Sequence, residues 1–439
     1  MNKLLLKVRM LLFGNRERAK ITKNIFWLFN EKVFRFTLGF FVSILVTRYL
    51  GPEQYGILSY AIAFAGLFGV FSTLGLNTIL VRELVKQPER RDEIIGTALS
   101  MMLISGFIFC LASICSIYFI RPDDHLSLLL VSILSVPFLF KAFKVIALYY
   151  ESEVNSKRVI PITLGVLVIT NLTKICLVYL NFSVAYFAVV SVLESILTSI
   201  SLVCLYTLTT TNSLKLLFNV GLAKSLFRDG FPLMLSSFMI IVYMRIDQVM
   251  IRELTNDKEA GLYAISVRLT ELWYFIPVII SSSTFPNIVK SLKHKEEAFN
   301  DKLQKLYNLI VLIFYFIAIP ISLFATPIIT MLYGEPYAES GILLSLLIWA
   351  GLFVGLGTIR GAYIFALNLT KIYLYITVSS AILNVVLNLI LIPIYGAMGA
   401  VLATLASYVL ASFLSCFIFK PLWQNGMMMI KALLWPFKL

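Results

Sequence analysis

Long apolar stretches recur along the chain and are separated by short polar segments. A membrane-spanning helix needs about 20 apolar residues, because each residue adds about 1.5 Å across a hydrocarbon core of about 30 Å. Twelve stretches reach that length: 24–47, 56–80, 96–120, 126–149, 159–180, 184–207, 230–252, 260–286, 306–332, 341–366, 371–392 and 397–419. The pattern therefore predicts an all-α integral membrane protein with about 12 transmembrane helices, in which short connections make neighbouring helices antiparallel.

Two connections, 208–229 and 287–305, are longer and charged. The first of them divides the predicted helices into two sets of six. The expected organisation is a basic cytosolic tail (1–23), an N-terminal six-helix bundle (24–207), a cytosolic linker (208–229), a C-terminal six-helix bundle (230–419) and a cytosolic amphipathic tail (420–439). In the last tail, Trp423 and Trp435 flank Lys431, which is typical of an interfacial anchor.

A short internal repeat supports this division into halves. Gly56-Ile57-Leu58-Ser59-Tyr60-Ala61 opens the second predicted span, and Gly261-Leu262-Tyr263-Ala264 opens the eighth. The eighth span is the second of the C-terminal half, so the match predicts two bundles with the same membrane orientation. Such parallel repeats are related by a pseudo-two-fold axis along the membrane normal, with a substrate path between them.

Composition supports lipid as the solvent of most of the chain. Of the 439 residues, 59% are hydrophobic and 14% are charged, whereas soluble domains carry about 25% charged residues. The net charge is +14, which in a soluble protein would suggest a nucleic-acid partner. In a membrane protein, cytosolic loops rich in Lys and Arg explain the same excess without nucleic acid.

The distribution of Lys and Arg predicts the orientation. With the N-terminus inside, the inner segments hold 25 of the 37 basic residues, the outer loops hold 4 and the spans hold 8. Basic residues concentrate on the cytoplasmic side of membrane proteins. We therefore expect both termini to be cytosolic.

Charged residues inside the predicted spans are the candidates for function. A charge near the bilayer centre costs at least about 2.5 kcal/mol, so such residues should face a polar cavity or each other. The cations are Lys32, Arg35, Lys141, Lys144, Lys174, Arg245, Arg268 and Arg360, and the acids are Glu31, Glu194, Asp247 and Glu271. The excess of cations favours an anionic ligand.

Spacing adds to this interpretation, although structural alternatives stay open. Lys32 and Arg35 are three residues apart, as are Lys141 and Lys144, so each pair places two positive charges on one helix face. Snorkelling to the nearest interface would instead explain Lys32, Lys174 or Arg360. Structural ion pairs, Arg245 with Asp247 and Arg268 with Glu271, are alternatives that remain open for those four residues.

Cysteine and histidine usage argues against a metal centre. The five cysteines, Cys110, Cys115, Cys176, Cys204 and Cys416, lie in apolar runs without metal-ligand spacing, and the chain has only two histidines. We expect the cysteines to be small buried apolar residues. No cofactor is expected.

An ordered set of motifs adds a family resemblance. They are Arg48-Tyr49-Leu50-Gly51-Pro52-Glu53-Gln54-Tyr55-Gly56, Leu58-Ser59-Tyr60-Ala61, Leu74-Gly75-Leu76, Val81-Arg82-Glu83-Leu84, Gly230-Phe231-Pro232-Leu233, Arg245-Ile246-Asp247-Gln248, Gly261-Leu262-Tyr263-Ala264, Glu271-Leu272-Trp273 with Pro277, Leu332-Tyr333-Gly334 with Tyr337, Asn388-Leu389, Ile392-Pro393 and Tyr395-Gly396-Ala397-Met398-Gly399-Ala400. This set resembles the polysaccharide biosynthesis (O-antigen flippase) family of the multidrug/oligosaccharidyl-lipid/polysaccharide exporter superfamily.

The resemblance implies a flippase that is not an enzyme. Such a protein would move a polyprenyl-diphosphate-linked oligosaccharide from the inner to the outer leaflet of a bacterial cytoplasmic membrane, and its fold would be two six-helix bundles. From the charges we expect the anion to be bound by Lys32, Arg35, Lys141, Lys144, Arg245, Arg268 and Arg360. The coupling ion is expected to be H⁺ or Na⁺, at Asp247, Glu271 or Glu194. Other membrane proteins of polysaccharide assembly are expected partners.

Other classes of protein fit the sequence less well. A small-molecule or multidrug antiporter of the same superfamily would share the architecture, but its cavity for cationic drugs should be acidic or aromatic. A glycan polymerase or glycosyltransferase would need a large outer domain or loop, whereas the longest outer loops predicted here have about ten residues. A Gly-rich phosphate loop, a metal cluster and a nucleophile–His arrangement are all missing from the sequence.

Overall fold

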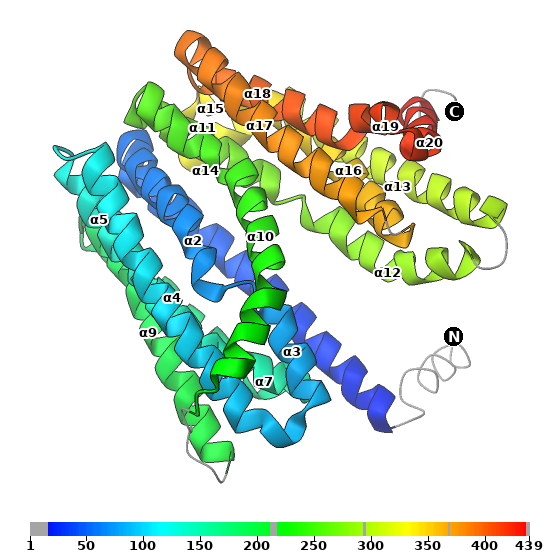
Figure 1. Cartoon of the computed structure of the whole chain (residues 1–439). Coiled ribbons are helices and arrows are strands. Elements are labelled where there is room, and N and C mark those ends of the chain that lie inside the picture. The colour runs from blue at the N-terminus through cyan, green and yellow to red at the C-terminus, as the bar shows by residue number, and fades with distance from the viewer. Residues whose placement is uncertain (1–15, 211–216, 293–295, 368, 436–439) are drawn as a thin grey trace, which may run out of the picture. The chain divides into compact units, whose positions relative to one another are not determined.

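The computed structural model describes residues 16–210, 217–292, 296–367 and 369–435, which are helical almost throughout (Figure 1). The earlier helices are α2 (Arg16–Gly69), α3 (Asn77–Lys86), α4 (Arg91–Ile120), α5 (His125–Ser135), α6 (Pro137–Phe140), α7 (Lys144–Ser152), α8 (Ile160–Tyr179) and α9 (Val184–Thr209). The later ones are α10 (Val220–Leu254), α11 (Asp257–Glu271), α12 (Phe275–Leu292), α13 (Glu296–Leu323), α14 (Ala325–Tyr333), α15 (Ser340–Leu347), α16 (Ala350–Ala366), α17 (Thr370–Tyr395), α18 (Ala397–Val409), α19 (Ser415–Ile418) and α20 (Trp423–Leu434). Within these ranges no β-strand occurs.

Eleven described helical segments are long and apolar enough to cross a membrane. The first of them, Asn30–Lys86, has 57 residues and contains most of the first predicted span and all of the second. The predicted fold class, an all-α membrane protein with about 12 spanning helices, is therefore confirmed.

The first two predicted spans are separated by a sharp change of backbone direction inside α2. Gly51 has φ +72° and ψ 170°, which are not helical angles, and Pro52 follows it directly. Glycine adopts positive φ without the clash that a Cβ atom causes, and proline suits the first turn of the next helix. The Gly-Pro pair thus ends one helix and starts another with no loop between them.

A second interruption lies in the span predicted over 126–149. Pro137 begins the short helix α6, and the 3₁₀ turn η3 (Lys141–Phe143) separates α6 from α7. A proline lacks the N–H that continues an α-helix, so the hydrogen-bond ladder breaks near it. Lys141 and Lys144 sit at this break.

By its internal contacts the chain groups into two compact units. Unit 1 comprises residues 1–49 and 64–238, and unit 2 comprises Leu50–Ala63 and Met239–Leu439. The segment Leu50–Ala63, which includes the turn at Gly51, therefore packs with the later helices. The domain boundaries expected from the sequence stay a prediction.

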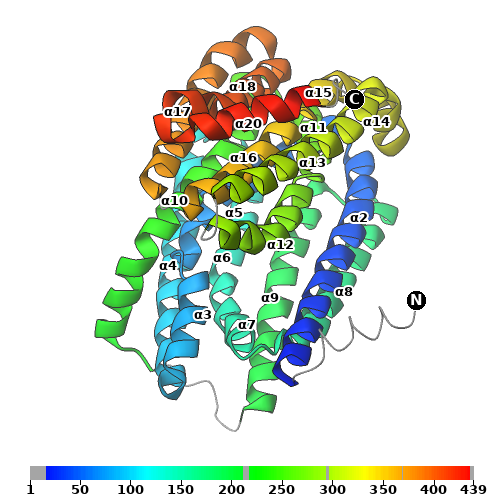
Figure 2. The same ribbon diagram turned by 90° about the vertical axis from the view of Figure 1, so that its right-hand side faces the viewer.

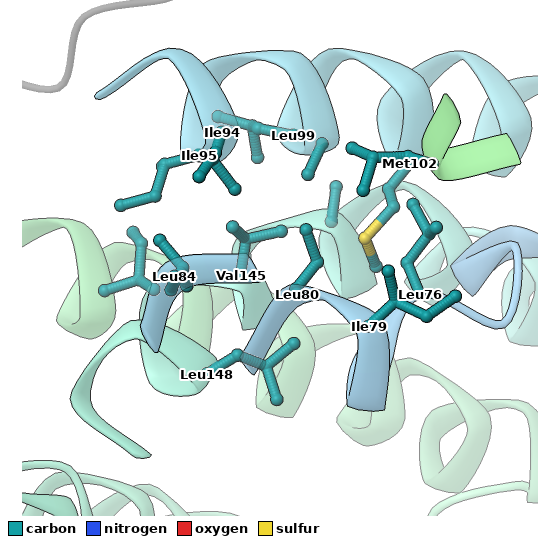
Figure 3. Close-up of a cluster of buried hydrophobic side chains, with 14 of the residues drawn as sticks. Leu76, Ile79, Leu80, Leu84, Ile94, Ile95, Leu99, Met102, Val145 and Leu148 are labelled. Atoms are coloured by element: carbon teal, nitrogen blue, oxygen red, sulfur yellow. The ribbon is translucent and has the colours of Figure 1, made fainter. Parts of the chain in front are cut away.

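The core of unit 1 is a cluster of aliphatic side chains from α3, α4 and α7 (Figure 3). Leu80 of α3, Met102 of α4 and Val145 of α7 are fully buried there. Leu226, near the start of α10, belongs to the same cluster and is 2% exposed. This packing attaches the beginning of α10 to unit 1.

The core of unit 2 is built by α12, α13, α16 and α20. Figure 2 shows α20 beside α13, and the Tyr307 hydroxyl donates to Asn425 Oδ1 at 2.9 Å between these two helices. The predicted C-terminal tail thus contains a helix that packs on the bundle, with Trp423 exposed. Residues 436–439 of that tail and most of the predicted N-terminal tail lie outside the described residues.

The expectation that all five cysteines are buried is wrong. Cys110 and Cys416 are buried, whereas Cys115, Cys176 and Cys204 are exposed on the protein surface. A spanning helix meets apolar lipid on its outer face, so an apolar residue need not be buried in protein. The cysteines are all free.

Candidate functional site

Asp247 is the most deeply buried acid of the predicted site. It lies on α10 in unit 2 and is 3% exposed. Its Oδ2 accepts hydrogen bonds from the hydroxyls of Tyr263 on α11, at 2.7 Å, and Thr404 on α18, at 2.6 Å. Its Oδ1 accepts from Asn388 Nδ2 on α17 at 2.6 Å, and the same Nδ2 donates to Asn384 Oδ1 at 3.2 Å. Four helices thus meet at one carboxylate, and we call these five residues the Asp247 cluster.

The chemistry of the Asp247 cluster suits a small hard cation or a proton. A buried carboxylate without compensation costs several kcal/mol, and three hydrogen bonds to the charged form offset part of that cost. Among the described residues no cation forms an ion pair with Asp247, and Asn388 Oδ1 is buried without a hydrogen-bond partner. Carboxylate, amide and hydroxyl oxygens are the ligands of hard cations, and the single negative charge matches an ion of charge +1.

Two residues before Asp247, Arg245 pairs with Glu271. Arg245 Nη2 lies 3.0 Å from Glu271 Oε2, linking α10 to α11, and both side chains are partly exposed. Arg245 and Asp247 do not pair, because side chains two positions apart point to different sides of a helix. Arg268 instead directs its Nη1 toward the Tyr55 hydroxyl at 3.5 Å, in the segment Leu50–Ala63.

Arg360 is buried in unit 2 and does not snorkel. It lies on α16, is 4% exposed and donates from Nη1 to Ser415 Oγ at 2.6 Å. Its Nε has no hydrogen-bond partner. Just before Ser415 the chain forms a π-helical turn, Leu410–Leu414, a feature often found at functional positions.

Unit 1 carries the other predicted cations. Arg35 forms an ion pair with Glu31, one helical turn earlier on α2, at 2.9 Å, and the Arg35 side chain is 41% exposed. Lys32 is exposed on the same helix. The positive charge at Arg35 is therefore compensated, whereas Lys32 is available to a ligand or to lipid headgroups.

Lys141 and Lys144 are both exposed at the break between α6 and α7. Lys141 Nζ donates to the Gly69 carbonyl at 3.3 Å and lies 4.9 Å from the centre of the Phe138 ring. In a 3₁₀ turn, residues three apart are eclipsed, so the two lysines project from the same side. Their predicted common face is thus kept despite the interruption of the helix.

Glu194, the third predicted acid, is half-buried on α9. Among the described residues, no Lys or Arg forms an ion pair with Glu194. In the described part of the chain, no group of three or more His, Cys, Asp or Glu residues is arranged to hold a metal ion. Glu194 and Glu271 therefore accept fewer hydrogen bonds from the described residues than Asp247 does.

Sequence reasoning missed the four partners of Asp247. Tyr263, Asn384, Asn388 and Thr404 are uncharged, so a search for charges in apolar spans does not find them. One signal was present: Asn384 and Asn388 are four residues apart in the span 371–392, and a buried amide in lipid also needs a partner. Two amides on one helix face indicate a polar interior position.

Comparison with known proteins identifies the family. Residues 21–292 match the family model described as "Polysaccharide biosynthesis protein", which is more than half of the chain, and residues 232–390 match the MatE model. The capsular polysaccharide biosynthesis protein CapF of Staphylococcus aureus is 22% identical over 396 residues, covering 89% of this chain and 97% of CapF. The probable flippase AglR of Haloferax volcanii is 29% identical over 188 residues, covering 39% of this chain and 37% of AglR.

Solved structures agree on the fold. An inward-facing MATE-family multidrug resistance transporter of the MOP superfamily has a TM-score of 0.69 at 15% identity, covering 91% of this chain and 93% of that one. The lipid II flippase MurJ, in an inward closed conformation, has a TM-score of 0.67 at 18% identity, covering 93% and 91%. The chain therefore belongs to the polysaccharide biosynthesis protein family, and the spanning segments among its described residues make it a multi-pass membrane protein.

Proposed function

We propose that this protein flips a polyprenyl-diphosphate-linked oligosaccharide, a repeat unit of a polysaccharide such as O-antigen, from the cytosolic to the outer leaflet of a bacterial cytoplasmic membrane. The observation that carries the proposal is the family match together with the likeness to a capsular polysaccharide biosynthesis protein over 97% of that protein's length. Both termini are cytosolic in this proposal, as the distribution of Lys and Arg predicts. Other polysaccharide assembly proteins of the membrane are its expected partners.

The diphosphate is the part of the substrate that this chain is best equipped to recognise. Arg and Lys are the natural partners of phosphate oxygens, and Lys32, Lys141 and Lys144 are exposed. Arg35 and Arg245 each hold a carboxylate, at 2.9 and 3.0 Å, that a diphosphate would replace. Arg268 and Arg360 complete the proposed cationic path.

Coupling to an ion gradient is assigned to Asp247. Its carboxylate is buried among amide and hydroxyl groups on four helices, so Na⁺ or H⁺ binding there would change how α10, α11, α17 and α18 pack. Glu271 is held by Arg245, which makes it the weaker candidate. In alternating access the path opens to one side of the membrane at a time. Binding of the ion would favour one of these two conformations, and binding of the substrate would favour the other.

A multidrug or small-molecule antiporter is the second candidate function. The MatE match over residues 232–390 favours it. The two candidates differ in the charge of the cargo, because a site rich in Lys and Arg repels cationic drugs. Transport of a cationic dye by the purified protein is therefore the discriminating observation.

The test is a leaflet assay in liposomes. The purified protein is reconstituted with a lipid-diphosphate-linked oligosaccharide, and transfer is scored by accessibility to a lectin. We expect transfer to require the protein, to fail in R35Q/K141Q and to persist in K302Q/K305Q, which removes two exposed lysines of α13. D247N should lose the response to a Na⁺ or H⁺ gradient. No transfer under gradients of either sign, with dye export instead, would reassign the protein as a small-molecule exporter.

A further inference from the structure

The start of α10 extends beyond the predicted span. α10 has 35 residues, Val220–Leu254, whereas the apolar span begins near residue 230. A helix of that length measures about 52 Å, well over the hydrocarbon thickness of about 30 Å. The first ten residues of α10 therefore lie at the boundary between lipid and water.

Two cations on this part of α10 have little compensation from acids. Lys224 and Arg228 are one helical turn apart, so they share a face. The neighbouring acid, Asp229, lies 2.7 Å from Arg82 Nη2 but 3.9 Å from Arg228 Nε. Arg228 is 82% exposed, and the described residues form no ion pair with Lys224. Lys224 and the exposed Arg228 are therefore both accessible to an anion from outside the protein.

Two aromatic rings accompany the cations. Phe227 and Phe231 pack on each other with ring centres 5.9 Å apart, and each is 46% exposed. Together with Lys224, Arg228 and Pro232 they line an open hollow of about 520 Å³. Basic groups beside exposed aromatic rings suit an interface at which headgroups and acyl chains meet.

Contacts on the opposite face of α10 determine which way the hollow faces. Leu226 is 2% exposed in the core of unit 1. A Cβ atom on Gly230 would lie 2.5 Å from the Leu74 carbonyl oxygen, so α10 crosses this backbone in close contact. Because these contacts hold the helix, the cations and rings face away from unit 1.

We propose that this face of α10 binds the phosphate headgroup of an anionic phospholipid. Lys224 and Arg228 bind the phosphate, while Phe227 and Phe231 contact the upper acyl chains. Charge complementarity selects this occupant over a second copy of the chain, whose net charge is +14. The site shares no residue with the proposed substrate path, and its test does not depend on transport.

The experiment measures lipid binding to the full chain in a neutral detergent. Phosphatidylglycerol is titrated while retained lipid is counted by native mass spectrometry and thermal stability is followed, with phosphatidylcholine as the neutral lipid. We expect saturable binding of phosphatidylglycerol. K224Q/R228Q should weaken it about 30-fold, which corresponds to about 1 kcal/mol for each of the two basic residues near an anionic surface.

The matched control is K157Q/R158Q, which removes one exposed Lys and one exposed Arg elsewhere in unit 1. It should bind phosphatidylglycerol like the unmodified protein, and K224R/R228K should restore most of the affinity. Equal loss in the two glutamine variants, or equal binding of phosphatidylcholine, would overturn the site. Self-association in light scattering that K224Q/R228Q abolishes and lipid leaves unchanged would instead assign the face to a second copy.

Discussion

Gly56 and Gly261 touch each other through their backbones. A Cβ atom on Gly56 would lie 2.9 Å from the Gly261 amide nitrogen, and one on Gly261 would lie 3.1 Å from the Gly56 amide nitrogen. These are the leading glycines of the two short repeats, Gly56–Ala61 and Gly261–Ala264. Equivalent positions of the repeat thus meet inside unit 2, where only a residue without a side chain leaves room.

Replacing either glycine by alanine should therefore destabilise unit 2. We expect a loss of about 1–3 kcal/mol for G56A or G261A, because an added methyl group must displace backbone. Thermal unfolding of the purified protein measures it. The control is G66A, also on α2, where a Cβ would meet nothing within 4 Å. If G56A unfolds at the same temperature as G66A, the close crossing is not present.

The tyrosines of the two repeats have similar partners on α10. The Tyr60 hydroxyl donates to Glu253 at 2.6 Å, and the Tyr263 hydroxyl donates to Asp247 at 2.7 Å. Arg252 lies over the Tyr60 ring, 4.5 Å from its centre. The repeats therefore place two hydroxyls on two carboxylates of one helix, and the carboxylate of Asp247 lies in a site of amides and hydroxyls.

The hydroxyl of Thr404 provides a direct test of ion binding at Asp247. T404V keeps the shape but removes the oxygen 2.6 Å from Asp247 Oδ2, whereas T404S keeps that oxygen. Loss of one polar partner of a buried charge costs about 1–3 kcal/mol. We therefore expect T404V to need about tenfold more Na⁺ for the same thermal stabilisation. Identical Na⁺ titrations of the two variants would exclude Thr404 as a ligand.

The pair Arg245–Glu271 should be coupled more strongly than an exposed pair. Its nitrogen and oxygen lie 3.0 Å apart, and the side chains are 33% and 23% exposed. A double-mutant cycle with R245A and E271A should give about 1 kcal/mol of coupling in unfolding free energy. The comparison is Arg35–Glu31, a turn apart on one helix, for which about 0.3–0.5 kcal/mol is typical. Coupling at or below that of Arg35–Glu31 would contradict the expected order.

The variant R360M distinguishes a structural role of Arg360 from a role in transport. Its buried guanidinium has an unpartnered Nε, so R360M, which removes the charge and keeps much of the length, should leave the protein as stable or more stable by about 1–2 kcal/mol. If Arg360 binds the substrate anion, the same variant should lose glycan transfer in the leaflet assay. S415A, which removes only the 2.6 Å partner, is the control. Wild-type transfer by R360M would remove Arg360 from the proposed path.

Many features of the fold were predictable because their cause is local. Each span needs about 20 apolar residues to cross the lipid, and an apolar stretch of that length can be recognised in the sequence without knowledge of the rest of the chain. The turn between the first two spans also has a local cause, since Gly51-Pro52 combines a residue that accepts positive φ with one that starts a helix. The break before Lys141 has a similarly local cause in Pro137.

The partners of the charged residues were not predictable, because contact across helices depends on packing. Arg245 and Asp247 look like a pair along the chain, yet Arg245 binds Glu271 on the next helix. Thr404 lies 157 residues from Asp247, and Asn388 lies 141 residues from it. No periodicity within one span specifies which distant span will face it.

The sequence by itself determined that this is a helical membrane protein, how many spans it has and which residues bear charge inside them. This was possible because each spanning segment must by itself be apolar and helical to be stable in lipid. Only the tertiary structure decided that Asp247 lies among four uncharged partners, that Arg360 is buried and that Gly56 meets Gly261. Those relationships depend on how whole helices rotate and cross, and many distant side chains set that geometry together.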